Sequence, residues 1–379
     1  MCADYKVTAW EVSGTIDYEK LIKEFGTSHL TKDLKERLRL KTKSKKLHPF
    51  FKRNFIYSHR DFDKVLENID NNNFYVYTGR GPSGEMHLGH LISFLTSKWL
   101  QDEFGCNVYI MISDDEKFSV KKNLTLEQID KQSDKDIEEI AAIGFDPDKT
   151  FIFKDTEYIK HLYKFALQFA KKTNLSNAKA IFGFTNETNL GHMFYPNIQN
   201  APTAFERNKF CLIPAGIDQD PYWRIQRDVA EKLGFKKVTA IHNKLLPPLQ
   251  GMDGKMSSSD NKTAIYLTDT PELVKSKVNK YAFSGGRPTL EEHRKLGGVP
   301  EIDVAYNWLY ILLEEDDIKI KEIYNKYKSG DMTSGEIKKI LIEKLNIFLE
   351  NHKQNKEKNK KLIERYKYTG KLAKEMWKL

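Results

Sequence analysis

The feature that most constrains this fold is an alternation of strand and helix patterns between residues 74 and 243. Short apolar runs occur at 74–79, 107–113, 150–155, 210–216 and 238–243, and the segments between them carry apolar side chains at helical spacing. Strands that are joined through helices pair in parallel, and the helices cover both faces of their sheet. We therefore predict an α/β fold with a doubly wound parallel sheet, whose ligands bind at the carboxyl ends of the strands.

The chain outside this alternation predicts further units. Residues 1–70 predict an N-terminal extension, in which a hairpin and a helix precede basic helices over 31–70 that are broken at His48-Pro49. Beyond about residue 268 the strand patterns stop, and helical patterns follow at 271–282, 290–297, 302–314, 317–328 and 333–364. We assign residues 71–268 to the α/β domain, 269–364 to an all-α domain and 365–379 to a C-terminal helix that returns to the α/β domain. The all-α domain indicates a macromolecular partner, with a regulatory or packing role as the alternative.

Composition narrows the class of protein. Hydrophobic residues make up 40% of the 379 residues, which supports a substantial core, and no apolar run approaches the length of a membrane span. The start MCADYKVTAWEVSG is typical of neither a secretory signal nor a transit peptide. The three cysteines lack a CxxC spacing, which favours a reducing compartment, so we expect a cytoplasmic protein.

The net charge of +9 is consistent with a polyanionic partner such as a nucleic acid. Lysines concentrate in KTKSKK at 41–46 and in NHKQNKEKNKK at 351–361. A lysine-rich helix face is also ordinary solvated surface, so the charge alone leaves both interpretations open.

The stretch GRGPSGEMHLGH at 79–90 follows a strand pattern and opens a helix. His87 and His90 lie three residues apart and could share a metal, but a closed set of further ligands is not visible nearby. Two other interpretations remain from the residues alone. One is an ordinary turn with capping histidines, and the other is a phosphate site, in which glycines let the backbone approach a ligand and the helix start offers free N–H groups.

A second stretch, KMSSS at 255–259, follows the last strand pattern, and Gly251 and Gly254 precede it. Its lysine supplies a point charge and its serines supply neutral donors, so a loop of this kind can close over a polyphosphate. The five residues are a weak signal alone. They are a strong one when they follow the histidine stretch in this order and on these elements.

Together the two stretches resemble the signature elements of the class I aminoacyl-tRNA synthetases: the histidine stretch matches one element through HLGH at 87–90, and KMSSS matches the other. More narrowly, five further stretches are similar to motifs of the eukaryotic and archaeal tryptophanyl-tRNA synthetases. They are TGRGPSG (78–84), SDDEKF (113–118), YPNIQNAP (195–202), GIDQDPY (216–222) and KVNKYAFSGGR (277–287). The similarity extends from about residue 5 to residue 350.

The resemblance implies a Rossmann-like catalytic domain with a C-terminal all-α anticodon-binding domain. It implies that L-tryptophan reacts with Mg-ATP to give tryptophanyl-adenylate and pyrophosphate, and that tryptophan is then transferred to the 3′ end of tRNA(Trp). ATP would carry the Mg²⁺, with no metal ligand from the protein. The implied assembly is a homodimer, whose interface lies in an insertion over about 120–206, and no membrane partner is implied.

Residue roles also follow from the resemblance. The catalytic residues would be His87, His90, Lys117, Lys255 and Arg80. ATP would be bound by Thr78, Gly79, Arg80, His87, Gly89, His90, Asp218, Lys255, Met256, Ser257 and Ser258. Tryptophan would be bound by Tyr77, Met111, Glu116, Lys117, Gln199 and Gln219. The acidic run at 114–116 could instead be a solvated loop or a metal cluster, but its place at the end of a strand favours a role in the site.

Met111 departs from the family pattern, because the usual second reader of the indole ring at this position is a glutamine. Methionine cannot accept an N–H with the strength of an amide, although its polarizable thioether packs well on an aromatic face. Tyr77 matches the tyrosine that contacts the ring. We therefore expect tryptophan as the amino acid, with tyrosine as the alternative, since the tyrosyl enzymes share this fold.

Two other functions are weaker. Nucleotidyltransferases of the same superfamily share the histidine motif but commonly lack a helical domain such as 271–379. A non-catalytic, synthetase-like binding protein would have lost a phosphate ligand, whereas Arg80, His87, His90, Lys117 and Lys255 are all present.

Overall fold

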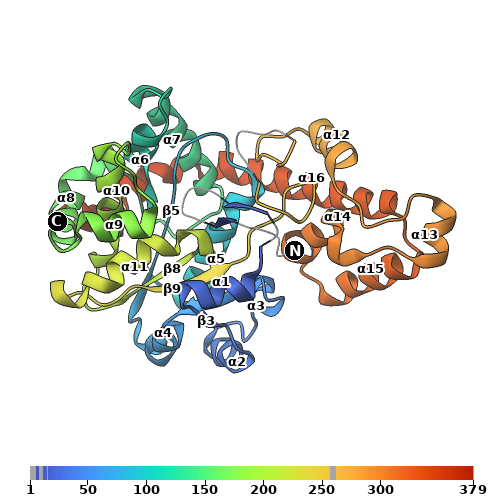
Figure 1. Ribbon diagram of the computed structural model, residues 1–379, viewed down its shortest axis with the longest axis horizontal. Coiled ribbons are helices and arrows are strands. Elements are labelled where there is room, and N and C mark those ends of the chain that lie inside the picture. Colours follow the sequence, from blue (N-terminus) through green and yellow to red (C-terminus); the bar gives the residue numbers. More distant parts are fainter. Residues whose placement is uncertain (1–5, 8–11, 15, 257–261, 379) are drawn as a thin grey trace.

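A seven-stranded sheet crosses the larger part of the molecule in the order β3-β4-β9-β8-β5-β6-β7 (Figure 1). The computed structural model describes residues 6–7, 12–14, 16–256 and 262–378. Pairing is parallel from β9 through β7 and antiparallel at the β3–β4–β9 edge. The strands are β3 (Ser28–His29), β4 (Ile56–Arg60), β5 (Phe74–Arg80), β6 (Val108–Ile112), β7 (Thr150–Lys154), β8 (Phe210–Gly216) and β9 (Thr239–Asn243).

Helices cover both faces of the sheet, which confirms the predicted doubly wound α/β fold. One face packs on α4 (Phe62–Asn68), α5 (Leu88–Phe104) and α7 (Leu126–Ala141), and the other on α8 (Asp155–Lys172), α10 (Leu190–Asn200) and α11 (Asp220–Val229). Alternate residues of each strand enter the two cores. Val76, Val108, Ile110 and Ile112 lie in the first core, and Tyr75, Tyr77, Tyr109 and Met111 lie in the second.

The order in which the chain adds strands to the sheet reverses at strand β5. It pairs with β6 on one side and with β8 on the other, because the chain proceeds from β5 to β6 and β7 and then returns to β8. Ligands of doubly wound sheets bind where the strand order reverses, at the carboxyl ends. The ends of β5, β6 and β8 lie side by side there, and they hold TGR, SDDEK and GIDQ.

The prediction of helices throughout residues 31–70 is wrong for residues 56–60. Three helices form as expected, α2 (Lys32–Lys41), α3 (Pro49–Lys52) and α4, but the segment between α3 and α4 is strand β4. It pairs antiparallel with β9, and its polar side chains find distant partners: Ser58 Oγ lies 3.0 Å from His242 Nδ1, and Arg60 Nη2 donates to Asp220 Oδ2 at 2.8 Å. The strand adds an antiparallel edge to the predicted parallel sheet.

Other elements differ in detail. A solvated loop is one alternative that the sequence leaves open for the acidic run at 114–116, whereas α6 (Asp114–Val120) begins there, just after β6. Residues 175–200 contain α9 (Leu175–Phe182) and α10, and α10 continues through Pro196. The predicted helix 302–314 divides into α14 (Val304–Trp308) and a π-helical turn over Leu309–Leu313.

The N-terminal segment packs over one end of the sheet. Strands β1 (Lys6–Val7) and β2 (Val12–Ser13) pair antiparallel, and α1 (Tyr18–Phe25) follows. Leu21 and Ile22 of α1 pack on Tyr57 of β4 and on Ile217, which follows β8. This small apolar cluster joins α1 to a segment that leads out of the sheet at its carboxyl edge.

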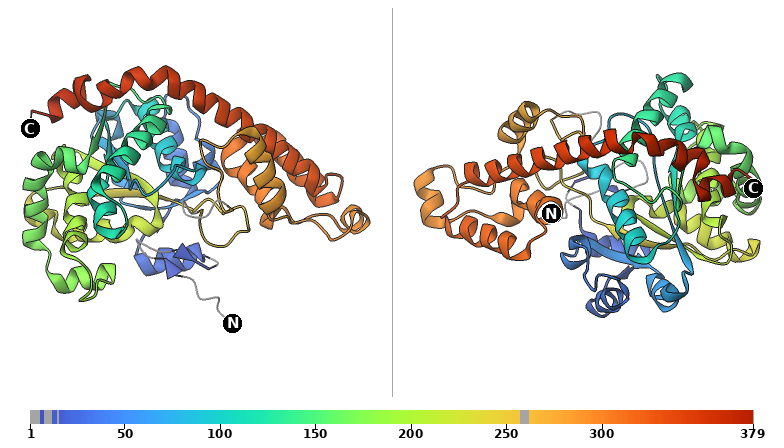
Figure 2. Two further views of the ribbon diagram at one scale, coloured as in Figure 1. Left: turned by 90° about the horizontal axis from the view of Figure 1, so that it is seen from above. Right: turned by 180° about the vertical axis from the view of Figure 1, so that it is seen from behind.

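The helical module follows the sheet and lies at one end of the molecule (Figure 2). Its helices are α12 (Pro271–Tyr281), α13 (Leu290–Leu296), α14, α15 (Asp317–Ser329) and α16 (Ser334–Asn359). Its buried residues form one continuous core with those of the α/β part, and Trp308 Nε1 donates to Pro247 O at 3.0 Å. Helix α16 extends from the far side of the module across to the α/β part.

Inside the module, the segment Phe283-Ser284-Gly285-Gly286 packs closely against the backbone around Val299. Gly285 N donates to Asp303 Oδ2 at 2.9 Å, and Val299 N donates to Gly285 O at 2.8 Å. A Cβ on Gly285 would lie 2.1 Å from the carbonyl oxygen of Val299, so the close approach of the two backbones requires glycine there. The SGG sequence is therefore explained by packing.

Helix α17 (Lys371–Met376) lies against β7 and α8. Tyr158 Oη donates to Met376 O at 2.7 Å, and Leu372 is buried in the core of that face. The assignment of functional units to the predicted domain boundaries stays a prediction. Within the described ranges, no helix combines the length and the apolarity that crossing a membrane would need.

Candidate functional site

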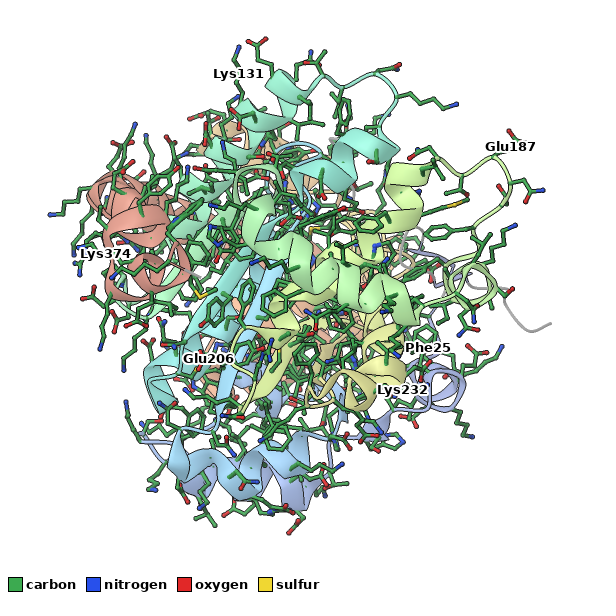
Figure 3. All side chains as sticks on the ribbon, turned by 90° about the vertical axis from the view of Figure 1, so that its left-hand side faces the viewer. Phe25, Lys131, Glu187, Glu206, Lys232 and Lys374 are labelled. Carbon is green, nitrogen blue, oxygen red and sulfur yellow. The ribbon has the colours of Figure 1, made fainter. Side chains whose placement is uncertain are left out.

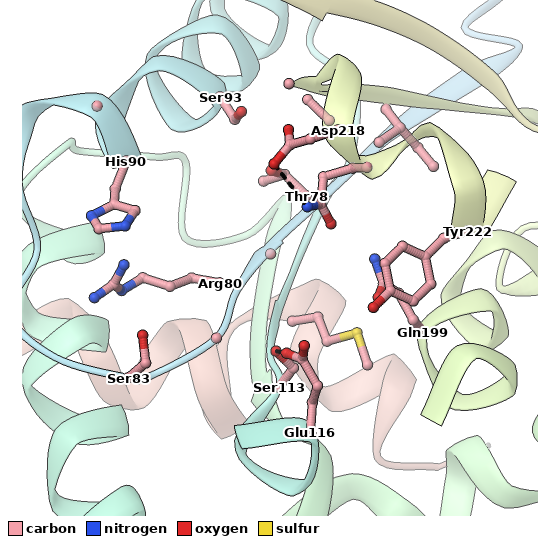
Figure 4. Close-up of a pocket in the computed structure, with 18 of the residues that line it drawn as sticks. Thr78, Arg80, Ser83, His90, Ser93, Ser113, Glu116, Gln199, Asp218 and Tyr222 are labelled. Atoms are coloured by element: carbon pink, nitrogen blue, oxygen red, sulfur yellow. Dashed lines mark hydrogen bonds between the residues drawn. The ribbon is translucent and has the colours of Figure 1, made fainter. Parts of the chain in front are cut away.

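A cavity of about 510 Å³ opens at the carboxyl ends of β5, β6 and β8 (Figure 4). Every described residue that the sequence placed in the site lines this cavity. They are Tyr77, Thr78, Gly79, Arg80, His87, Gly89, His90, Met111, Glu116, Lys117, Gln199, Asp218, Gln219, Lys255 and Met256. Ser257 and Ser258 lie outside the described residues. Segments that are far apart in the sequence thus meet around one space.

The two histidines form the start of α5. His87 is the N-cap residue, its backbone N–H donates to His90 Nδ1 at 3.1 Å, and the two rings stack with centroids 3.6 Å apart. A Cβ on Gly89 would lie 3.2 Å from the His87 ring, which explains the glycine between them. Among the described residues, one cluster of three potential metal ligands lies close enough together to hold an ion. It consists of Asp114, Asp115 and Asp155 and includes neither histidine. A metal shared by this pair is therefore not supported.

Burial and nearby positive charge favour the neutral form of both imidazoles. Burial, followed by the nearby charges of Arg80 and Lys255, lowers the pKa of His87 to about 3. Burial likewise holds the pKa of His90 well below its ordinary value, and the same cations add to the effect. The Nδ1 atom of His87 is buried and has no hydrogen-bond partner among the described residues. A neutral imidazole of this kind can turn an N–H toward an anion.

Arg80 reaches from the end of β5 toward His90 and Ser83 (Figure 4). Its Nε donates to Asp136 Oδ2 of α7 at 2.6 Å, and its Nη2 donates to Gly84 O. Because a guanidinium has five N–H donors, the remaining ones can point into the cavity. The ion pair is buried, with the arginine side chain 3% exposed and the aspartate side chain 1% exposed.

Lys255 approaches the cavity from the loop after β9. Its Nζ lies 3.2 Å from Asp218 Oδ2, and the Gly254 backbone N–H donates to Gly14 O at 3.2 Å. Met256 is buried beside the histidine turn, with its sulfur 3.6 Å from a Cβ placed on Gly89. The loop therefore lies against the start of α5, and its lysine is paired with a carboxylate.

Glu116 and Lys117 stand in the first turn of α6. Lys117 Nζ lies 2.8 Å from Glu116 Oε2, and Ser113 Oγ donates to the same carboxylate at 3.2 Å. The lysine side chain runs directly over Gly81, where a Cβ would lie 1.9 Å from Lys117 Cε. Because Gly81 has no side chain, it leaves room for Lys117 to extend its ammonium group into the cavity.

An apolar end of the cavity lies around Tyr77 and Met111. Tyr77 Oη is 2.9 Å from Gln199 O and 2.8 Å from Met111 Sδ. A carbonyl is the stronger acceptor, so the hydroxyl proton points to Gln199 and a lone pair of the oxygen remains able to accept an N–H. The rings of Tyr77 and Trp223 meet edge to face with centroids 6.1 Å apart.

Sequence reasoning missed part of the lining. The described lining also includes Ser83, Ser93, Tyr195, Tyr222, Trp223, Asn243, Leu245 and Leu246. Tyr195 and Tyr222 stand inside the quoted motifs YPNIQNAP and GIDQDPY, so the signal for them was present. Trp223 follows directly after the second motif and had no signal of its own.

The acidic run at 114–116 is part of a helix and is not a solvated loop. Oxygen atoms of Asp114, Asp115 and Asp155 lie within 4.8 Å of one another, which is a geometry that a cation could use. Asp114 Oδ1 accepts the backbone N–H of Thr156 at 3.0 Å. Burial raises the pKa of Asp115 to about 7 and that of Asp155 well above its usual range. Bound protons therefore reduce the negative charge of the group.

Comparison with known proteins adds a family. The family model described as tRNA synthetases class I (W and Y) matches residues 69–350. A tryptophan–tRNA ligase of Sulfurisphaera tokodaii is 54% identical over 379 residues, which cover 100% of this chain and 99% of the relative. One of Pyrococcus abyssi is 55% identical over 378 residues, which cover 100% of this chain and 97% of the relative.

The fold has a matching solved structure as well. A Plasmodium falciparum tryptophanyl-tRNA synthetase superposes with a TM-score of 0.88 at 42% sequence identity, and the match covers 94% of this chain and 99% of that one.

The state of His87 can be measured directly. We expect its ring carbon-bound proton to keep the chemical shift of a neutral imidazole from pH 8 to pH 5 in the unliganded protein, because its pKa is about 3. Bound tripolyphosphate should raise that pKa, since a nearby anion favours the charged ring. An NMR titration, with His87→Asn to assign the signal, tests both points. A midpoint near 6.5 without ligand would contradict the neutral pair.

Proposed function

The chain belongs to the class I tRNA synthetases of the W and Y family, and from this membership we propose that it is a tryptophan–tRNA ligase. It activates L-tryptophan with ATP and transfers the amino acid to the 3′ end of tRNA(Trp). The observation that carries the proposal is the single cavity lined by the histidine turn, by Lys255 and by the aromatic end around Tyr77. Full-length relatives that carry this name support it.

The first step joins the amino acid to the nucleotide. A carboxylate oxygen of tryptophan attacks the α-phosphorus of ATP, the bond between the α-phosphorus and the bridging oxygen breaks, and pyrophosphate leaves. Such a reaction needs little covalent help from the protein, so positioning and charge stabilisation supply the catalysis. The cavity offers donors and cations for this purpose, and none of the proposed catalytic residues acts as a nucleophile.

The polar end of the cavity holds the triphosphate. His87 and His90 donate neutral N–H groups at the start of α5, and Arg80, Lys117 and Lys255 supply positive charge. Loss of one such donor typically reduces the rate by a factor of about 10²–10³. Each of the three cations pairs with a carboxylate in the unliganded protein. Phosphate oxygens replace the partners of Lys117 and Lys255 when ATP binds, whereas Arg80 keeps Asp136 and offers its remaining N–H groups.

Backbone and loop groups complete the nucleotide site. Thr78 and Gly79 line the cavity next to Arg80, and Asp218, which lines the same cavity, pairs with Lys255. Magnesium enters with ATP and is held by its phosphates, because Mg²⁺ prefers phosphate oxygens and water to a cage built wholly from protein. The proposed metal ligands therefore come from the substrate.

The apolar end holds the indole ring. Tyr77 Oη accepts the ring N–H through its free lone pair, and Met111 packs its thioether on the aromatic face. Glu116 and Gln199 hold the ammonium group, with Lys117 and Gln219 nearby. Tyrosine, the alternative amino acid, has no ring N–H for Tyr77 to accept.

The helical module binds the anticodon part of tRNA(Trp) in this proposal, and the protein acts in the cytoplasm. The lysine-rich stretch 351–361 contributes less to tRNA binding than its number of lysines indicates. Lys356 Nζ lies 2.6 Å from Glu139 Oε1, and Lys360 Nζ lies 3.7 Å from Glu138 Oε1, so these two ammonium groups are directed at α7.

The amino-acid preference is tested by ATP–pyrophosphate exchange. Tryptophan should support exchange at a rate at least about 10² times that of tyrosine or phenylalanine, because only the indole presents an N–H to Tyr77. Equal or faster exchange with tyrosine would make the protein a tyrosyl enzyme. If none of the three amino acids supports exchange, the result would favour a non-catalytic binding protein.

Met111→Gln tests the aromatic end. The amide adds a second acceptor for the indole N–H, so the ratio of kcat/KM for tryptophan over a ring analogue without that N–H should rise about tenfold. Met111→Leu keeps a similar volume and adds no acceptor, and it should leave the ratio near that of the wild type. If both variants give the same ratio, the side chain at 111 does not read the ring.

A homodimer is the proposed assembly. Large apolar side chains are exposed near the ends of α6, α8, α9 and α10: Phe118, Tyr163, Leu167, Leu175 and Leu190. Figure 3 looks onto this side, with Glu187 in the loop before α10. Asn189 Nδ2 donates to Ser119 O at 2.8 Å, which places the start of α10 beside the end of α6. An apolar surface of this kind marks a protein interface.

Leu190 is 83% exposed at the first position of α10 and offers a direct test of the dimer. Leu190→Glu should convert the protein to a monomer in sedimentation velocity, because a charge would be buried in the interface. Leu290→Glu is the matched control, since that leucine is 63% exposed on the helical module. A wild-type monomer at micromolar concentration would contradict the assembly.

A further inference from the structure

Helix α7 lies between the cavity and the long helix α16. Two of its carboxylates, Asp136 and Glu139, are three residues apart, so they stand one turn apart on the same side of the helix. Both are buried, at 1% and 6% exposure. Carboxylates are rarely buried unless they are paired, so each position needs a specific partner. The two partners lie in different parts of the molecule.

Asp136 faces the phosphate end of the cavity. Its Oδ2 accepts Nε of Arg80 at 2.6 Å, and its Oδ1 accepts Nε2 of Gln132 at 2.9 Å. Both carboxylate oxygens are therefore held. The pairing fixes one edge of the Arg80 guanidinium and directs the opposite edge toward the cavity.

Glu139 faces α16. Its Oε2 lies 2.7 Å from His352 Nε2, and its Oε1 lies 2.6 Å from Lys356 Nζ. One turn later Asn359 Nδ2 donates to Ala141 O at 3.0 Å. The contact between the two helices is thus a run of polar bonds with fixed geometry, which resists sliding more than an apolar contact would.

The other end of α16 belongs to the helical module. Ser284 Oγ donates to Ser334 Oγ at 2.6 Å where α16 begins, and Ile337 and Leu341 are buried in the module core. A helix of this length spans about 39 Å at 1.5 Å per residue. Figure 2 shows it running from the module to the α/β part as a continuous element.

We propose that Asp136 and Glu139 are positioning residues for Arg80, and that they connect the placement of α16, and with it the helical module, to the phosphate site. The inference rests on the proposed function, in which Arg80 binds ATP. Displacement of α16 moves Glu139, α7 moves as a rigid helix, and Asp136 carries the guanidinium of Arg80 with it. Neither residue touches substrate.

The test measures KM for ATP and KM for tryptophan in pyrophosphate exchange without tRNA. Asp136→Asn should raise KM for ATP roughly tenfold while KM for tryptophan changes less than about twofold, because only the phosphate end loses its support. Glu139→Gln should produce a smaller rise of the same kind, about threefold. A purely structural role would not separate the two substrates.

Glu138→Gln is the matched control. Glu138 also pairs with α16, through Lys356 and Lys360, but its side chain is 31% exposed whereas that of Glu139 is 8% exposed, and water weakens exposed ion pairs. It should leave both KM values at their wild-type levels. The double variant Asp136→Asn/Glu139→Gln should raise KM for ATP less than the product of the two single effects, since both act through Arg80.

The outcomes separate this inference from the proposed function. Wild-type protein without tryptophan-dependent exchange would refute the function. Active wild type with an unchanged or lowered KM for ATP in both single variants would overturn the inference alone, and so would multiplicative effects in the double variant. If Asp136→Asn does not fold, Glu139→Gln against Glu138→Gln still decides the question, through binding of a non-hydrolysable ATP analogue by calorimetry.

Discussion

The pairing of β5 with both β6 and β8 is the constraint on which the rest of the structure depends. A strand at the point where the sheet reverses direction must end beside two neighbours that the chain reaches by different routes. The loops that leave these strands therefore meet at one edge. Tyr77 through Arg80, the start of α6 and the segment after β8 come together for this reason, although about 140 residues separate the first from the last.

The electrostatics of the cavity follow from its burial. Burial lowers the pKa of both imidazoles, and the cations that share this desolvated space lower it further. Each cation also has a carboxylate neighbour: Asp136, Glu116 or Asp218. The unliganded site is thus close to charge balance. A polyphosphate competes with Glu116 and Asp218 for the two lysines, while Arg80 stays paired with Asp136, and this competition makes the site selective for ligands of high negative charge.

Much of this could be read from the sequence. Apolar runs located the parallel strands to within a residue or two, because buried parallel strands consist almost wholly of apolar side chains. The same rule failed for β4, whose Ser58 and Arg60 are polar and are satisfied by residues distant in sequence. The motifs located the described site residues. Asp136 could not be found in this way, because its role depends on Arg80, 56 positions earlier, and a helix position carries no sign of such a partner.

One contact near the cavity is made without side chains. The Gly254 N–H donates to the carbonyl oxygen of Gly14, so the loop that carries Lys255 is joined to the beginning of the chain through backbone atoms alone. Sequence changes in either segment can leave such a bond intact as long as both peptide groups keep their orientation. Gly254 has a φ of +78°, a conformation that other residues rarely adopt. Gly14 has the same φ of +78°, so tolerance of substitution at this junction depends on the backbone shape of these two residues, and the surrounding side chains are free to diverge.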